Sequence, residues 1–213
     1  MTDASSPNKL TNFATEGIIA GLAEDRLQSI QTDRHDYMDP RHLEQLAGKV
    51  HLLCGTSHKA KRISHSTSHA ECNAAAKGIP LSQLIAMRLA EPELVQRHQL
   101  STPLALLQIQ DTAKCPIMVD AYIDCMDLWE LACGLRGIPQ DKSQRLGVLA
   151  IREERRTLRL RRLYHIRTKY MLADMLTKIA GADSKSLLEL ITCGHWTIAS
   201  DVRVRQGFGM SSQ

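Results

Sequence analysis

Aromatic side chains are scarce in this sequence, and long hydrophobic runs are lacking. Aromatics make up 4% of the 213 residues, so aliphatic side chains must build most of the core. No apolar run approaches the roughly 20 residues that a membrane span needs, and residues 1–10 lack the apolar centre of a signal peptide. The sequence therefore predicts no membrane association and an intracellular location.

Paired cysteine motifs are lacking as well. None of the six cysteines belongs to a C-x-x-C pair, which predicts free thiols and argues against a disulfide framework. A structural zinc site is an alternative, because histidines and cysteines gather in one region, but their spacing matches no standard finger. Its candidate ligands are His51, Cys54, His58, His65, His69 and Cys72.

What the sequence does contain is typical of a globular protein with a mild positive charge. Hydrophobic residues make up 43%, charged residues 23%, and the net charge is +4. A mildly basic chain permits a polyanionic partner. Arginines crowd residues 152–167, where Arg159, Arg161 and Arg167 are candidate phosphate contacts. The alternative is a solvated helix end and strand face.

The hydrophobic pattern predicts an α/β fold, in which a mixed sheet is flanked by helices. Strands are expected over 15–23, 49–54, 117–123 and 158–166. Helices are expected over 66–91, 104–109, 125–136, 141–156, 169–179 and 184–193. We expect the first helix to kink or split at Gly78-Ile79-Pro80 and to end at Pro92, because proline cannot donate the helical hydrogen bond.

Several local segments resemble one family. Ser66–Glu71 (STSHAE) resembles the S-S-T-x-A-E segment, and Leu172–Lys178 (LADMLTK) resembles the L-A-D-x-L-T-K segment, of copia-type retrotransposon ribonuclease H domains. Tyr122–Leu128 (YIDCMDL) is similar to the family's strand-end Asp segment, and residues 2–5 with 15–19 to its first strand and hairpin. The resemblance covers residue 2 to about 196 and is weakest over 24–48.

This resemblance implies a ribonuclease H-like fold and an acidic site. It assigns Asp3, Glu71, Asp124 and Asp174 as catalytic residues and metal ligands. Carboxylates suit Mg²⁺, with Mn²⁺ as the alternative, and two such ions can activate water and stabilise the leaving oxygen of a phosphodiester. The implied reaction is cleavage of the RNA strand of an RNA–DNA hybrid, recognised through the 2′-hydroxyl. The implied partner is the reverse transcriptase portion of the same polyprotein.

Each acidic residue also has a simpler interpretation. Ser68-x-x-Glu71 fits a helix capping box, and Asp124 fits a helix cap. Asp3 fits a frayed terminal residue, and Asp174 fits a residue on the surface of a helix. Asp120 and Asp127 compete with Asp124 as the third carboxylate. The alternative function is a decayed retroelement remnant that kept the fold and acts only in nucleic-acid binding or structure.

The expected domain covers residues 1–196, followed by a C-terminal tail at 197–213. Only Met1 and Thr2 precede Asp3, whereas strands usually run about five or six residues. We therefore expect a truncated first strand in a fragment of a longer polyprotein.

Overall fold

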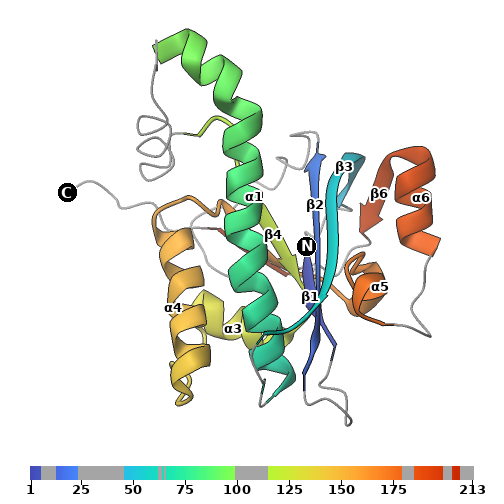
Figure 1. Ribbon diagram of the computed structural model, residues 1–213. Helices are drawn as coiled ribbons and strands as arrows, with labels where there is room; N and C mark the ends of the chain where they lie inside the picture. The colour runs from blue at the N-terminus through green and yellow to red at the C-terminus, as the bar shows by residue number, and fades with distance from the viewer. Residues whose placement is uncertain are drawn as a thin grey trace.

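The chain forms a mixed α/β structure in which helices flank two sheets (Figure 1). The computed structural model describes residues 1–5, 13–23, 46–61, 64, 66–98, 115–178, 185–198 and 203–206. The predicted α/β class is confirmed. The helix expected over 104–109 and residue His65 lie outside the described residues.

The first sheet is antiparallel and has the order β1-β2-β3-β6. Its strands are β1 (Thr2–Ala4), β2 (Thr15–Ala23), β3 (Leu46–Lys59) and β6 (His195–Ile198). Three of these strands were predicted, β1 as the truncated first strand that the family resemblance implies, although β3 is longer than the expected 49–54. Asp3 lies opposite Gly17 in the β1–β2 register, which places this carboxylate within the sheet.

The second sheet supplies the other side of the candidate site. It contains β4 (Asp120–Ile123), β5 (Arg162–His165) and β7 (Arg203–Gln206), with β4 parallel and β7 antiparallel to β5. Because β1 also contacts β4, β1 lies between β2 and β4. Residues 203–206, assigned to a tail from the sequence, pair with β5.

The strands separate two hydrophobic clusters, as side chains that alternate along a strand point to opposite faces. Ile123 and Leu163 pack with α1 (Thr67–His98), α3 (Met126–Cys133) and α4 (Lys142–Arg156). Tyr122 and Tyr164 stack on the other face, with ring centroids 4.6 Å apart, and pack with α6 (Lys185–Cys193). Figure 1 shows α1, α3 and α4 on one side of the sheets, with α5 (Asp174–Thr177) and α6 on the other.

Helix α1 is longer than the sequence predicted. Of the expected kink or split at Pro80, the split was wrong, and so was the expected end at Pro92, because both prolines lie inside one continuous helix. Packing on both sides of each proline offsets the lost hydrogen bond: Ile79 and Ala86 belong to the main cluster, and Leu94 is buried beyond Pro92. Gly78 lets α1 approach the sheet closely, since a Cβ there would meet Thr2 Cγ2 at 2.2 Å.

The C-terminal half corrects three predicted boundaries. The helix after Asp124 ends at Cys133, because Gly134 adopts a left-handed conformation and caps it before the expected Gly137. The strand expected over 158–166 is limited to β5, since Leu158 has a φ of 60°. The helix expected over 169–179 was wrong: a 3-10 turn η3 (Thr168–Tyr170) and the single turn α5 replace it.

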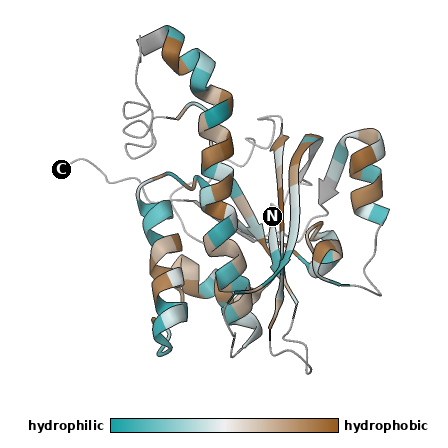
Figure 2. Cartoon of the chain, viewed as in Figure 1, coloured by the Kyte–Doolittle hydropathy of each residue, from teal (hydrophilic) through white to brown (hydrophobic). Residues whose placement is uncertain are grey.

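Hydrophobic residues on the helices and strands are interspersed with polar ones (Figure 2). Among the described helices, none combines the length and the apolarity that crossing a bilayer requires. All six cysteines are free thiols, as predicted.

Candidate metal centre

Three carboxylates from distant parts of the chain converge at one end of the sheets. Asp3 comes from β1, Glu71 from the second turn of α1, and Asp124 from the residue after β4. One ligand oxygen of each lies within 4.8 Å of the others. Asp3 and Glu71 are only 4% and 3% exposed, so their charges are poorly solvated.

Asp3 is held by the elements on both of its sides. Its Oδ2 accepts a hydrogen bond from the buried Thr177 hydroxyl of α5. The residue opposite Asp3 must be small, because a Cβ on Gly17 would lie 2.8 Å from the Ala173 carbonyl oxygen. Gly17 therefore lets α5 approach the sheet and bring Thr177 to Asp3.

Glu71 does not cap its own helix. The cap of α1 is Ser66, whose Oγ accepts from the His69 N–H at 3.1 Å, so the predicted cap at Ser68 was wrong. Glu71 Oε1 accepts from the backbone N–H of Ala4 at 2.9 Å. Glu71 Oε2 is buried and has no hydrogen-bond partner among the described residues, which leaves one oxygen available to a ligand.

The geometry favours Asp124 over its two competitors. Asp120, at the start of β4, accepts hydrogen bonds from Nε and Nη2 of the Arg161 guanidinium at 2.9 and 2.6 Å. Asp127 is exposed and pairs with Arg136 at 2.8 Å. Asp124 alone of the three belongs to the acidic group.

Asp174 lies beside this group without joining it. Its charge acts on both Asp3 and Asp124, and its Oδ1 forms an ion pair with Lys178. Three of the four predicted ligands therefore converge, and the fourth is a charged neighbour that is held by a lysine.

Burial and mutual repulsion make the group hold protons tightly. Burial first, and the Asp3 and Asp124 charges second, raise the pKa of Glu71 to about 10. Burial raises the pKa of Asp3 to about 6, although the Thr177 hydrogen bond opposes the shift. Burial also raises the pKa of Asp124, against a hydrogen bond from the Thr168 side chain. At neutral pH, Glu71 is therefore protonated in the absence of a cation.

A hard divalent cation fits this donor set. Carboxylate oxygens are the ligands of such ions, and a cation would relieve the repulsion that raises these pKa values. The group of Asp3, Glu71 and Asp124 can thus hold a metal ion.

Sequence reasoning gave no role to three polar residues that support the site. Thr177 and Lys178 lie three and four positions after Asp174, the spacing that puts helical side chains on one face. Their spacing from Asp174 is the sequence signal that could have indicated Thr177 and Lys178 as neighbours of the site. Thr168 binds Asp124 across 44 positions of sequence, and no local pattern indicates it.

The predicted phosphate-binding arginines are not equivalent. Arg159 forms an ion pair with Glu154 at 2.9 Å, and Arg161 is held by Asp120. Both positive charges are therefore balanced within the chain. Arg167 is exposed and follows β5, at the same end of the parallel strands as Asp124.

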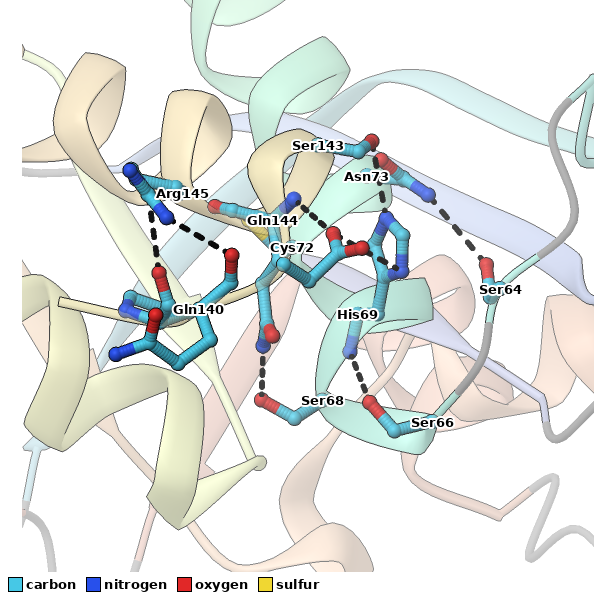
Figure 3. A network of polar contacts seen from close by, with 12 residues as sticks. Ser64, Ser66, Ser68, His69, Cys72, Asn73, Gln140, Ser143, Gln144 and Arg145 are labelled. Carbon is cyan, nitrogen blue, oxygen red and sulfur yellow. Dashed lines mark hydrogen bonds and ion pairs between the residues drawn. The ribbon is translucent and has the colours of Figure 1, made fainter.

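Three of the candidate ligands of the zinc alternative contact other groups. His69 Nε2 lies 3.2 Å from Ser143 Oγ, and Cys72 Sγ lies 3.7 Å from the Gln144 carbonyl oxygen, as Figure 3 shows at the junction of α1 and α4. His58 pairs with Glu16 at 2.9 Å. In the described part of the chain, the one group with metal-ligand geometry is the acidic one.

We expect Thr177→Val to weaken metal binding by about 10- to 100-fold, the usual cost of removing a hydrogen bond that orients a ligand. Valine keeps the shape of threonine but cannot donate to Asp3. Calorimetric titration with Mn²⁺ measures the effect. Thr177→Ser, which keeps the hydroxyl, should retain most of the affinity; equal losses in both variants would contradict this role.

Comparisons of the chain with protein-family models, with curated proteins and with solved structures find no match.

Proposed function

We propose that this chain is a metal-dependent endonuclease of the ribonuclease H type, which cleaves the RNA strand of RNA–DNA hybrids as part of a retrotransposon polyprotein. The observation that carries the proposal is the convergence of Asp3, Glu71 and Asp124. These are three of the four residues that the resemblance to copia-type domains assigns. The central position of β1, between β2 and β4, agrees with the same family's fold.

The metal in this proposal is Mg²⁺, with Mn²⁺ as the alternative, held by Asp3, Glu71 and Asp124. When bound, such ions supply an activated water and neutralise charge on the leaving oxygen. Thr177 orients Asp3, and the Ala4 N–H orients Glu71. Lys178 pairs with Asp174 beside the site. Arg167, which follows β5 at the same end of the parallel strands as Asp124, is the proposed contact for a phosphate of the hybrid, and the reverse transcriptase portion of the polyprotein is the proposed partner.

Cleavage of a hybrid whose RNA strand is end-labelled tests the proposal. We expect the RNA to be cut in the presence of Mg²⁺ and to stay intact in EDTA. The same RNA without its DNA complement should also stay intact. If Mn²⁺ binds in calorimetry but neither Mg²⁺ nor Mn²⁺ supports hybrid cleavage, the proposal fails and the decayed remnant is the better interpretation.

A further inference from the structure

The end of α5 brings two successive side chains to the acidic end of the sheets. Thr177 donates to Asp3, and the next residue, Lys178, forms an ion pair with Asp174. The backbone joins the second pair as well, since the Lys178 N–H donates to the Asp174 carbonyl at 3.1 Å. Figure 1 shows α5 beside the strands of the first sheet. Lys178 is therefore bound to Asp174 through both its main chain and its side chain.

The Lys178 ammonium group also acts on carboxylates of the metal centre. A hydrogen bond to Asp174 first, and then the charges of nearby carboxylates, raise the pKa of Lys178 although partial burial opposes the shift. These carboxylates are Asp174, Asp3 and Asp124. Asp174 is only 9% exposed, and a buried carboxylate needs a positive partner. One ammonium group thus balances Asp174 and interacts with two of the three residues that can hold a metal ion.

A second metal ion would compete with Lys178 for Asp174. The three-carboxylate group of Asp3, Glu71 and Asp124 can hold one ion, and the buried Glu71 Oε2, which has no hydrogen-bond partner among the described residues, is an available ligand there. In sites for two ions, the metals lie about 3.5–4 Å apart, so a second ion needs a further carboxylate beside the group. Asp174 is such a carboxylate, but its Oδ1 binds Lys178.

We propose that Lys178 is the built-in second cation of this centre, so that the chain binds one divalent ion at the three-carboxylate group instead of two. The inference rests on the metal centre of the proposed function and extends it, because it fixes the number of ions and assigns the residue that excludes the second one. Lys178 is a positioning residue: it neutralises Asp174 and holds it beside the ion.

The structure has room for a second hydrated ion beside this ion pair. A cavity of about 220 Å³ adjoins the pair, and its lining includes Thr168, Lys169, Asp174, Lys178 and Ser186. Lys169 places its ammonium group over the Tyr170 ring, 4.6 Å from the centroid. A bound Mg²⁺ usually keeps several waters, and each water takes about 30 Å³. The positive charge of Lys178, and not a lack of space, therefore excludes the second ion.

Calorimetric titration of the full chain with Mn²⁺ counts the bound ions. We expect the unchanged chain to bind one ion and Lys178→Gln to bind two, because the neutral side chain leaves Asp174 available. The second ion should bind Lys178→Gln at least about tenfold more tightly than any second ion binds the unchanged chain, since a positive charge at ion-pair distance no longer repels it. Lys178→Arg keeps the charge and should bind one ion.

Lys185→Gln is the matched control for the loss of a lysine charge. Lys185 also pairs with a carboxylate four positions away, that of Glu189, but both side chains are mostly exposed and Glu189 lies outside the three-carboxylate group. We expect this variant to bind one ion. Thermal melts in EDTA show whether each variant is folded; if Lys178→Gln is not, the number of ions on the unchanged chain and on Lys178→Arg still decides.

Two ions of similar affinity on the unchanged chain would overturn the proposal, and so would a single ion on folded Lys178→Gln. If no variant binds Mn²⁺, the metal centre and this inference fail together. None of these measurements uses hybrid cleavage. A chain that binds one ion but cuts no hybrid therefore refutes the proposed function and leaves the role of Lys178 standing.

Discussion

Asp124→Asn should lower Mg²⁺-dependent hybrid cleavage by about three orders of magnitude, which corresponds to about 4 kcal/mol of transition-state stabilisation. The amide keeps the shape of the side chain but removes a negative charge from a group whose three ligand oxygens lie within 4.8 Å. Initial cleavage rates at saturating Mg²⁺ measure the effect.

The matched control for this substitution is Asp127→Asn. Asp127 lies three positions further along the chain, is exposed, and pairs with Arg136, outside the acidic group. We expect its cleavage rate to stay close to that of the unchanged chain. Similar rates for the two variants would show that Asp124 takes no part in the reaction.

Glu71→Gln should make the metal-free chain more stable at alkaline pH while it abolishes the response to metal. Folding raises the pKa of Glu71 from 4.5 to about 10, so the folded state holds a proton that the unfolded state has lost between these values. The free energy of unfolding therefore falls as pH rises through this window, by up to about 1.4 kcal/mol per pH unit. Glutamine is neutral at every pH, can still accept from Ala4, and removes this penalty.

Thermal melts in EDTA at pH 5.5 and 8.5 measure this effect. The stabilisation by Glu71→Gln should be small at pH 5.5 and a few kcal/mol at pH 8.5, which is on the order of 5 °C or more in melting temperature. Glu93→Gln, an exposed position on the same helix, should show no such difference. A Glu71→Gln chain that melts below the unchanged chain at pH 8.5 would contradict the prediction.

The residue types of the site were readable from the sequence, but their partners were not. Ser68-x-x-Glu71 has the spacing of a capping box, and only the approach of β1 shows that Glu71 binds Ala4 instead. Asp120 and Asp124 have the same place in the strand alternation. The two residues differ because Asp120 binds Arg161, which lies 41 positions further along the chain.

Tertiary packing also overrides local signals elsewhere in the fold. Prolines predicted a first helix that kinks or splits at Pro80 and ends at Pro92, yet buried neighbours on both sides keep α1 continuous through both prolines. The helix expected over 169–179 is two short turns, and this shorter path allows Thr177 to reach Asp3. The arginine cluster suggested a phosphate-binding surface, but Glu154 and Asp120 balance two of its charges.

The contact between Thr177 and Asp3 spans 174 positions of the chain, and this has a consequence for synthesis on the ribosome. Asp3 is translated long before the residue that orients it, and β1 gains its neighbour β4 only after residue 120 has been made. A nascent chain that ends before Thr177 therefore contains Asp3 and Glu71 but lacks the hydroxyl group that orients Asp3. In the proposed function, tight cation binding requires a chain translated through α5, so metal binding would mark the stage of translation at which Thr177 has reached Asp3.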